Sequence, residues 1–349
     1  MRLRRIKVAC FLSLLVAANA CKKDKPEDKI QPTPVITNST GVFVVNEGTF
    51  NFGTAKISYY NIATDVVTED LFKPANNRPL GDVAQSMCFF NNKAYVVVNN
   101  SGKIEVVDPK TFVASSTISG FKSPRYFLPV NDNKAYVTDL FSNSIAVVDL
   151  TTNTIKKNIL CIGWTEQLVR VSDKAFVTNY NSDKVYVVNT TTDVIDDSIA
   201  VTYSCASITK DKNGFLWVLS SGNEKKNVFP ELFKINPANN KVELSIQFST
   251  LTDSPNRLCM NGSLDVLYYL AKNGVYKLPI GDTQLPTTPV IKKGNYNLYG
   301  LGIDPKNETI YLADAIDYVQ IGKIYRYKPD GSFINSFAAG IIPSSFYFN

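Results

Sequence analysis

The stretch that decides the fold is Lys93–Asp108, which reads KAYVVVNNSGKIEVVD. Two runs of alternating and β-branched residues flank a polar turn, a pattern that predicts a pair of antiparallel β-strands. The pattern returns at Lys134–Asp149 (KAYVTDLFSNSIAVVD) and at Lys174–Asn189 (KAFVTNYNSDKVYVVN). The first run of each pair carries an aromatic residue near its start, so the pattern can be followed along the rest of the chain.

This aromatic residue occurs seven times, at spacings of 40 to 52 residues, and the seven positions are Phe43, Tyr95, Tyr136, Phe176, Trp217, Tyr268 and Tyr311. A repeat of about forty residues that consists of strands and turns is typical of a β-propeller. We interpret the seven aromatic residues as packing residues between sheets. We therefore predict an all-β fold, a seven-bladed β-propeller whose blades are four-stranded antiparallel sheets.

Each repeat after the first supplies an inner strand before the aromatic run, as at Ser123–Leu128, and every repeat supplies a fourth strand after the second run, as at Thr154–Ile159. The first repeat lacks an inner strand, because a proline-bearing stretch precedes Val42. The C-terminal segment Ser344–Phe348 is left over and resembles the inner strands of other repeats. We predict that it pairs beside Val42–Val45 and closes the ring, which removes exposed sheet edges.

The N-terminal segment has the features of an export signal. Arg2, Arg4, Arg5 and Lys7 precede the apolar run Val8–Ala18, which is too short to span a bilayer as a mature helix. Ala18-Asn19-Ala20 before Cys21 fits both ordinary signal cleavage and a bacterial lipobox, and we expect lipidation of Cys21 because a polar tether follows. The predicted organisation is a signal peptide at 1–20, a lipid-anchored flexible tether at 21–40 and the propeller at 41–349.

Charge and cysteine content narrow the class of partner. The net charge of +6 includes four positive residues of the predicted signal, so the remaining domain is nearly neutral and gives no electrostatic case for nucleic-acid binding. Cys88, Cys161, Cys205 and Cys259 lack the CxxC spacing of a zinc or redox site, and we expect buried free thiols. Cys161 and Cys205 begin adjacent inner strands and are the pair to test for a disulfide.

The chain contains no histidine, which removes the commonest general base and transition-metal ligand. Ser-His-Asp and Cys-His catalysis are excluded, and no P-loop, HExxH motif or complete dinucleotide fingerprint is present. We therefore expect a protein that is not an enzyme and that holds no metal and no cofactor. A carboxylate pair acting as acid and base stays open, with six loop carboxylates to draw on: Glu47, Asp82, Asp139, Glu166, Asp314 and Asp317.

One face of the predicted ring has the more varied loops. In an antiparallel meander, the loops between second and third strands share a face with the links between blades. These loops mix aromatic residues with amides and a few charges, which suits a wide polar organic ligand or a protein partner. We expect specificity at Glu47–Gly53, Gly222–Pro230 and Asp314–Gln320, where the repeat departs from its period. The candidate ligand-binding residues are Asn46, Glu47, Phe50, Asn99, Arg125, Asp139, Phe141, Trp164, Glu166, Gln167, Asn179, Tyr180, Arg257, Tyr299, Asp314 and Tyr318.

Three further motifs carry a family resemblance. They are Gly41–Gly48 (GVFVVNEG), Ile57–Asn61 (ISYYN) and Gly81–Met87 (GDVAQSM), and the repeated strand pairs accompany them. Together they resemble YncE-like propellers of the DUF5074 type over nearly all of the chain after the tether. The resemblance implies a seven-bladed surface lipoprotein that acts as a monomeric propeller.

One branch of that family, the BtuG-type proteins, captures cobalamin at the outer surface of Gram-negative bacteria and passes it to a TonB-dependent transporter. The resemblance thus implies an exported outer-membrane lipoprotein at the cell surface, with a corrinoid as ligand and a TonB-dependent outer-membrane transporter as partner. The periplasmic leaflet is the alternative location. Two other functions stay open: an envelope scaffold or adhesion propeller that binds protein or glycan, and a propeller lyase or lactonase.

Overall fold

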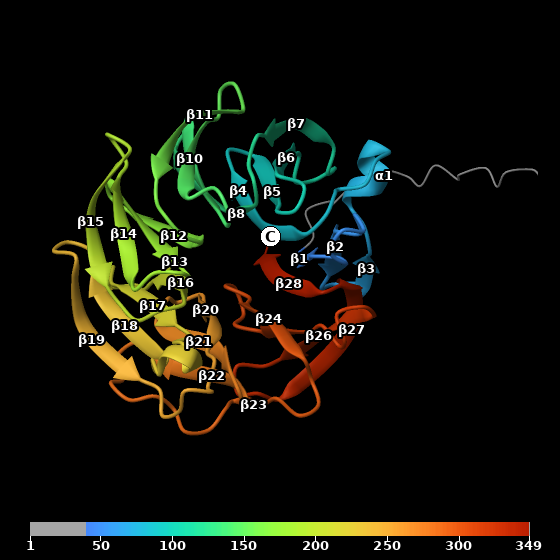
Figure 1. The fold of residues 1–349 in the computed structure, drawn as a ribbon. Coiled ribbons are helices and arrows are strands. Elements are labelled where there is room, and N and C mark those ends of the chain that lie inside the picture. Colours follow the sequence, from blue (N-terminus) through green and yellow to red (C-terminus); the bar gives the residue numbers. More distant parts are fainter. Residues whose placement is uncertain (1–39, 349) are drawn as a thin grey trace, which may run out of the picture. The chain divides into compact units, whose positions relative to one another are not determined.

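The computed structural model describes residues 40–348, which form a ring of seven four-stranded antiparallel sheets (Figure 1). The predicted seven-bladed β-propeller is thereby confirmed. The predicted signal peptide, the lipidation site Cys21 and nearly all of the tether lie outside the described residues. We number the blades 1 to 7 in chain order, beginning with the blade that contains Val42.

Within every blade the strands follow one another from the axis of the ring to its edge. In blade order, the inner strands are β28 (Pro343–Phe348), β4 (Ala84–Phe90), β8 (Pro124–Asn131), β12 (Thr165–Val171), β16 (Cys205–Lys210), β20 (Asn256–Met260) and β24 (Leu298–Ile303). The second strands are β1 (Gly41–Asn46), β5 (Lys93–Val98), β9 (Lys134–Asp139), β13 (Lys174–Asn179), β17 (Leu216–Ser220), β21 (Val266–Ala271) and β25 (Ile310–Asp314).

The two outer positions complete each sheet. The third strands are β2 (Lys56–Asn61), β6 (Lys103–Val107), β10 (Ser144–Asp149), β14 (Lys184–Asn189), β18 (Glu231–Asn236), β22 (Gly274–Pro279) and β26 (Ile321–Tyr327). The outermost strands are β3 (Val66–Thr68), β7 (Ala114–Ser119), β11 (Thr154–Leu160), β15 (Val194–Ala200), β19 (Lys241–Gln247), β23 (Ile291–Lys292) and β27 (Phe333–Ile341). Among the described residues, the helices are α1 (Phe72–Asn76) and a 3-10 turn at Glu224–Lys226.

The hydrophobic core is divided into seven clusters, one between each pair of neighbouring blades. Residues of a second strand alternate between two clusters, because successive side chains of a strand point to opposite faces. Tyr95 and Val97, for example, pack toward blade 3, whereas Val96 packs toward blade 1. All seven repeated aromatic residues are at most 2% exposed and pack toward the following blade. Their predicted role as packing residues is confirmed.

The ring is closed by the two ends of the propeller, which meet in blade 1. β28 pairs antiparallel with β1, with Val44 opposite Phe346, as Figure 1 shows for the red and blue strands. The rings of Phe346 and Phe348 lie 5.7 and 5.3 Å from the ring of Tyr311 in blade 7. The C-terminal strand therefore joins blade 1 to blade 7, as the sequence predicts.

A buried carboxylate attaches the segment after α1 to blade 2. Glu105 on β6 has no exposed side-chain surface, and both Nη atoms of Arg78 donate to its carboxylate oxygens at 2.7 and 2.8 Å. Lys103 Nζ and Thr117 Oγ1 also donate to it, at 2.6 and 2.9 Å. Burial by itself raises the pKa of Glu105, but the hydrogen bonds from Arg78 and Lys103 outweigh it, so the pKa lies below its usual range.

We expect Glu105→Gln to lower the free energy of unfolding by about 2 kcal/mol near neutral pH, because charged hydrogen bonds are lost. A depressed folded-state pKa stabilises the fold above the unfolded value of about 4.3, and that contribution is lost as the pH falls through the folded pKa. The difference between wild type and variant should therefore shrink in acid, as measured by urea unfolding. Glu243→Gln, at an exposed position of β19, is the matched control. An equal difference at neutral and acid pH would contradict this account.

The four cysteines of the described residues are free. Cys161 and Cys205 are buried, so the expectation of buried thiols is confirmed for both, and the disulfide considered between them is not formed. Burial raises the pKa of each of these two thiols to about 12. Within residues 40–348, no helix is long and apolar enough to cross a bilayer, and no group of three or more potential ligand side chains is placed to hold a metal ion.

Candidate functional site

Every inner strand carries a register shift near its first residue, at the same end of the ring. Such β-bulges place two residues opposite one and re-aim a side chain, and they are common beside functional sites. This end is the face formed by the links between blades and by the loops between second and third strands, and we call it the loop face. In blade order, the bulge residues are Ser344, Gln85, Arg125, Glu166, Ala206, Arg257 and Tyr299.

Three of these bulge residues form a connected group across blades 2 to 4. Arg125 Nη2 and Nε lie 2.8 and 3.0 Å from Glu166 Oε1, and Arg125 Nη1 donates to Gln85 Oε1. The Glu166 side chain is 4% exposed, so this ion pair is largely removed from water. The Arg125 guanidinium also lies 5.6 Å from the Trp164 ring centroid, within cation–π range.

A second group spans blades 6, 7 and 1. Arg257 Nε donates to the carbonyl oxygen of Tyr299 at 2.8 Å, and its guanidinium lies 5.0 Å from the Tyr299 ring centroid. The Tyr299 hydroxyl donates to Glu47 Oε2 at 3.0 Å. Glu47 is the residue that follows β1, so its side chain comes from the loop of blade 1 and not from an inner strand. We call these two groups together the channel mouth: Gln85, Arg125, Glu166, Arg257, Tyr299 and Glu47.

The two groups act on each other electrostatically. Burial raises the pKa of Glu47, and the charges of Arg257 and Arg125 offset this only in part. Burial likewise raises the pKa of Glu166, and both arginines again oppose it. Because each arginine acts on the carboxyl group of the other group, the four charged side chains share one region at the channel mouth.

Arg257 differs from the other charged residues of the mouth in two ways. Its backbone φ is 56°, in the left-handed region where a residue with a long side chain is strained. Among the described residues, its two Nη atoms have no hydrogen-bond or ion-pair partner, and its guanidinium forms one hydrogen bond, which Nε donates to Tyr299 O. The strained backbone of Arg257 lowers the stability of the fold, and its unused donors at the channel mouth point to a functional role.

A cleft of about 710 Å³ opens on the loop face beside the mouth, between blades 4, 5 and 6. Ala206 lines it, and Ala206 is the small bulge residue between Glu166 and Arg257 around the ring, so cleft and mouth adjoin. Tyr180 and Tyr203 supply aromatic surface, and the Lys226 ammonium lies 3.9 Å from the Tyr203 ring centroid. The predicted specificity segment Gly222–Pro230 contributes residues to this cleft. Aromatic surface with a few polar groups is typical of a site for an organic ligand.

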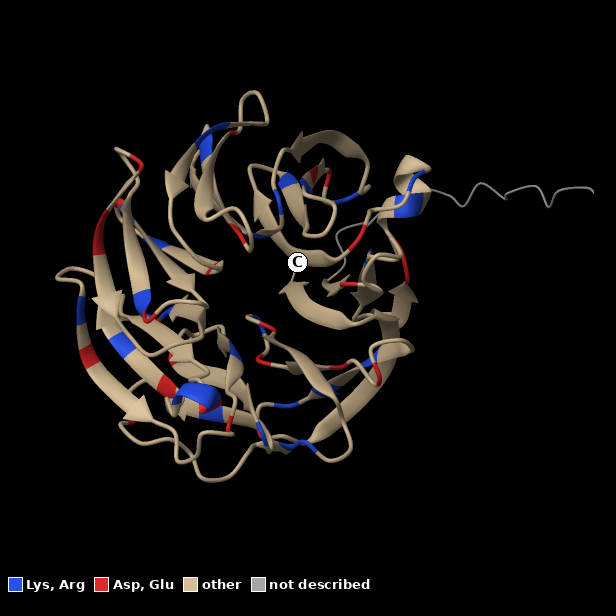
Figure 2. Cartoon of the chain, viewed as in Figure 1, with Lys and Arg blue, Asp and Glu red and all other residues tan. Residues whose placement is uncertain are grey.

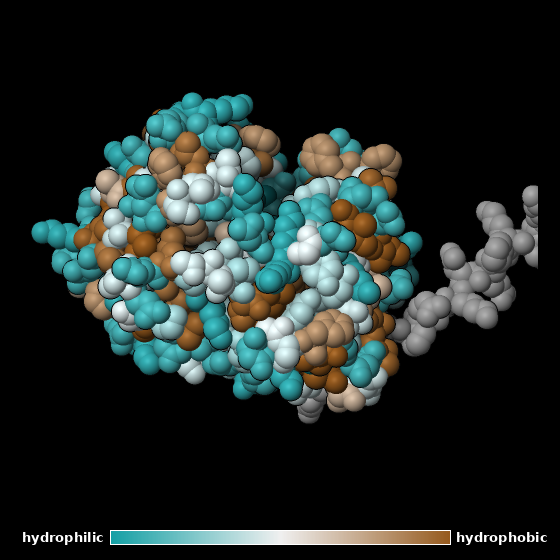
Figure 3. All heavy atoms as spheres, turned by 90° about the horizontal axis from the view of Figure 1, so that it is seen from below, coloured by the Kyte–Doolittle hydropathy of each residue, from teal (hydrophilic) through white to brown (hydrophobic). Residues whose placement is uncertain are grey.

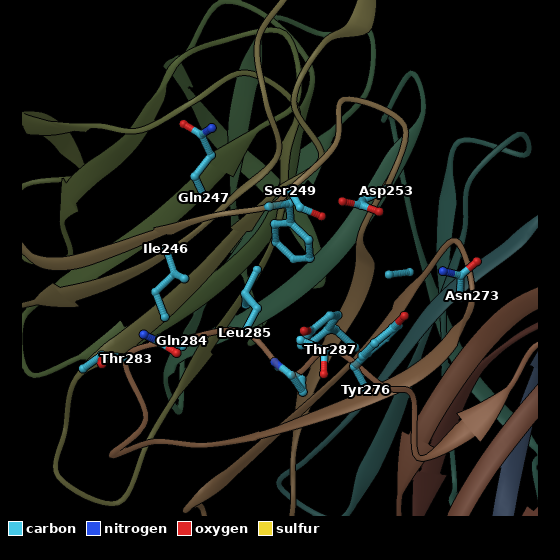
Figure 4. Close-up of a pocket in the computed structure, with 14 residues that line it drawn as sticks. Ile246, Gln247, Ser249, Asp253, Asn273, Tyr276, Thr283, Gln284, Leu285 and Thr287 are labelled. Atoms are coloured by element: carbon cyan, nitrogen blue, oxygen red, sulfur yellow. The ribbon is translucent and has the colours of Figure 1, made fainter.

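Two other hollows are less suited to a ligand. Figure 4 shows one of about 450 Å³ between blades 5 and 6, where residues of the segment after β19 face residues of the loop before β23. Its aromatic side chains Phe248, Tyr269 and Tyr276 belong to the core between those blades. The other, of about 620 Å³, lies on the face opposite the loop face, and its charged groups are paired with one another, as in Lys134–Asp193 at 2.7 Å.

The sixteen candidate residues divide into groups once their positions are known. Glu47, Arg125, Glu166, Arg257 and Tyr299 converge at the mouth. Trp164, Tyr180 and Tyr318 lie next to it: the Trp164 and Tyr180 rings are 4.8 Å apart, and the Tyr318 ring is 5.7 Å from that of Tyr299. Phe50 and Phe141 are 62% and 66% exposed on the rim of the loop face.

The remaining six candidate residues form hydrogen bonds that stabilise the fold. Their polar atoms bind neighbouring segments, as when Asn46 Oδ1 accepts from the Gly340 amide at 2.7 Å and Asp139 Oδ2 accepts from the Ser123 amide at 2.9 Å. The six are Asn46, Asn99, Asp139, Gln167, Asn179 and Asp314. Their place in polar loops is therefore explained by loop architecture.

Sequence reasoning missed Gln85 and Ala206, which belong to the mouth and to its border with the cleft. Both occupy the bulge position that Arg125 and Glu166 occupy in their own blades. Alignment of the inner strands alone would have found them, because the position repeats even where the residue type does not. Figure 2 shows basic and acidic residues dispersed around the ring, and Figure 3 shows hydrophobic patches separated by hydrophilic surface along its edge.

Comparisons with known proteins identify the kind of domain. A family model described as "Domain of unknown function (DUF5074)" matches residues 40–342. A search of curated protein sequences found no significant match.

Several solved structures share the fold. A quinonprotein alcohol dehydrogenase-like protein from Bacteroides thetaiotaomicron is 16% identical, with a TM-score of 0.72 over 89% of this chain and 79% of that one. A candidate 6-phosphogluconolactonase from Bacteroides fragilis is 13% identical, with a TM-score of 0.62 over 90% and 99%. Apo AztD from Citrobacter koseri is 8% identical, with a TM-score of 0.56 over 89% and 98%. At such identities the likeness concerns the propeller fold alone.

Proposed function

The chain belongs to the DUF5074 family of domains of unknown function, and we propose that it captures an organic ligand at the channel mouth and in the adjoining cleft, without converting it chemically. The support is the convergence of five predicted residues at one end of the axis, next to a cleft with aromatic walls. A propeller suits this task, because a rigid ring holds many loops around one site.

The observation that carries this proposal is the state of Arg257. A guanidinium whose Nη atoms are unused can donate two parallel hydrogen bonds to a carbonyl, carboxylate or phosphate group of a ligand. Its strained backbone costs on the order of 1–3 kcal/mol, which the packing of the ring must offset. Strain retained at a bulge beside a cleft is what a preorganised binding residue requires.

The first ligand we propose is a corrinoid, because the resemblance to cobalamin-capturing propellers implies it. A corrinoid offers amide carbonyls and a phosphodiester to arginine donors, and a wide ring to aromatic side chains. We further propose that a lipid on Cys21 holds the protein at the outer membrane, where it passes the ligand to a TonB-dependent transporter. The neighbouring aromatic residues Tyr180 and Tyr203 provide contact area in this proposal.

Calorimetric titration of cyanocobalamin into the purified mature protein tests the corrinoid proposal. We expect saturable binding to one site per chain at micromolar concentrations, with the corrinoid recovered unchanged. Absence of heat, together with no change in the corrinoid absorption spectrum, would remove the corrinoid. Release of an altered corrinoid would contradict capture without conversion.

A second candidate function, docking of a protein partner on the rim, is favoured by exposed apolar side chains. Phe50, Phe52 and Val319 are 62%, 75% and 67% exposed in the loops of blades 1 and 7. Exposed aromatic residues are enriched at protein interfaces. If docking is the main function, Phe50→Ser with Phe52→Ser should abolish co-purification of an envelope protein from producing cells, while ligand binding at the mouth is unchanged.

A further inference from the structure

The two arginines of the channel mouth are in different states. The donors of Arg125 are already in use: Arg125 forms an ion pair with Glu166 at 2.8 Å and a hydrogen bond with Gln85. Arg257 forms no ion pair within the described residues, and it acts electrostatically on Glu47, whose carboxylate accepts a hydrogen bond from the Tyr299 hydroxyl at 3.0 Å. The mouth therefore holds one cation with free donors and one carboxyl group without a direct cationic partner.

We infer that the captured ligand carries a carboxylate or phosphate group that binds the Arg257 guanidinium, and that Glu47 takes up a proton when this group binds. The inference rests on the proposed capture at the channel mouth and specifies the class of ligand. Oxyanions match the two Nη donors of an arginine in geometry and charge. The Tyr299 ring, 5.0 Å from the Arg257 guanidinium, provides an adjacent surface for the apolar part of the ligand.

Proton uptake follows from the position of Glu47. The groups that face it are Tyr299 on β24, Arg257 on β20, Arg125 on β8 and Ser344 on β28. An anion on Arg257 would neutralise the main positive charge that acts on Glu47 and would place a second negative charge beside it. Both effects favour the protonated carboxyl group, so anion binding and protonation of Glu47 support each other.

The affinity for the anion should fall as the pH rises. In the free protein burial already raises the pKa of Glu47, and a neighbouring anion raises it further. Binding is then tightest below the pKa of Glu47 in the free protein, and it weakens as the pH rises through the pKa of the complex. Glu166 contributes less, because its charge is compensated directly by Arg125.

The probes for the test are benzoate, its neutral isostere benzamide, and inorganic phosphate. Dissociation constants are measured by ligand-observed NMR on the mature protein at about pH 5 and about pH 8, both above the ordinary glutamate pKa of about 4.3. We expect benzoate to bind at least about 10-fold more tightly than benzamide at the lower pH, which corresponds to about 1.4 kcal/mol of binding free energy. Equal affinity for benzoate and benzamide would overturn the inference. Phosphate binding without benzoate binding would assign the site to phosphate groups, and the reverse to carboxylates.

An internal reporter shows whether the probe binds at the mouth. The chain has two tryptophans; Trp217 is fully buried in an interblade core, whereas Trp164 lies beside Arg125. Benzoate should therefore change the fluorescence of the wild type and not that of Trp164→Phe. If benzoate changes the fluorescence of Trp164→Phe as much as that of the wild type, the probe binds elsewhere and the inference is overturned.

Three variants separate the roles. Arg257→Gln should weaken benzoate binding at least about 10-fold, as expected for loss of charged hydrogen bonds. Arg170→Gln is the control and should not weaken it, because Arg170 lies at the end of β12 that is away from the loop face. Glu47→Gln should bind benzoate with less than about a two-fold change between the two pH values, against about 10-fold for the wild type. Tyr299→Phe, which removes a hydrogen bond that lowers the Glu47 pKa, should move the transition to higher pH. A wild-type pH profile in both Glu47→Gln and Tyr299→Phe would refute proton uptake at Glu47.

The outcomes also distinguish this inference from the function on which it rests. If cyanocobalamin or a neutral molecule binds at the mouth with equal affinity in wild type and Arg257→Gln, capture is supported and recognition of an anionic group by Arg257 is refuted. If neither anions nor neutral molecules perturb Trp164, both proposals fail.

Discussion

Removal of residues 343–349 is expected to abolish cooperative folding of the propeller. β28 is the inner strand of blade 1, where Phe346 lies opposite Val44 of β1. Without β28, the backbone groups of β1 that face it become a free sheet edge. The cluster between blades 7 and 1 also loses the rings of Phe346 and Phe348. The measurement is thermal unfolding by circular dichroism together with size-exclusion chromatography, and we expect aggregation or a broad transition.

A milder variant makes this result interpretable. Phe346→Ala keeps the strand and removes one partly buried ring, which should cost about 2 to 4 kcal/mol of unfolding free energy. Phe333→Ala, at a position of β27 that is 57% exposed, is the matched control and should cost much less. A truncated chain that unfolds cooperatively at the wild-type temperature would show that the ring does not depend on its C-terminal strand.

Arg257→Gly is expected to lose ligand affinity by at least about 30-fold while the fold is as stable as the wild type or more stable. Glycine adopts a φ of 56° without strain, so the substitution relieves on the order of 1 kcal/mol or more, against the greater entropy of a glycine in the unfolded chain. Loss of an arginine anchor and its charged hydrogen bonds typically costs about 2 kcal/mol or more of binding energy, which is about 30-fold or more. Calorimetry and thermal unfolding measure the two effects separately.

The control for this prediction is Arg170→Ala. Arg170 lies at the opposite end of β12, where its Nε donates to Ser172 O at 2.8 Å, far along the strand from the loop face. Ligand affinity should be unchanged in this variant. A stable Arg257→Gly protein with undiminished affinity would show that the strain at this position serves the fold and not the ligand.

The fold could be predicted from the sequence because a propeller gives a repeat of about forty residues, with alternating apolar and polar residues in its strands. Phe43, Tyr95 and Tyr311 recur at positions that must pack between sheets, and each is buried as expected. Closure by Ser344–Phe348 followed from counting: one inner strand was missing and one strand was left over. The short helix α1 has no such signal, because five residues are too few to show a helical period.

The site was predictable only in part, because loop position does not determine side-chain direction. Glu47 and Asn46 are adjacent, yet Asn46 is fully buried and binds the backbone while Glu47 reaches the mouth. In the inner strands the direction is set by a bulge, and a one-residue shift of register turns a side chain to the other face. A bulge of this kind leaves no mark in residue type, as Ala206 and Gln85 illustrate.

The central claim is that the loop face binds a ligand through Arg257, and a crystal structure of the complex with the tightest-binding probe tests it most directly. We predict an oxygen atom of the ligand within hydrogen-bond distance of the Arg257 Nη atoms, with the rest of the ligand directed toward the cleft lined by Tyr203 and Ala206. A ligand bound on the opposite face, or one on the loop face that leaves Arg257 without contact, would contradict the account.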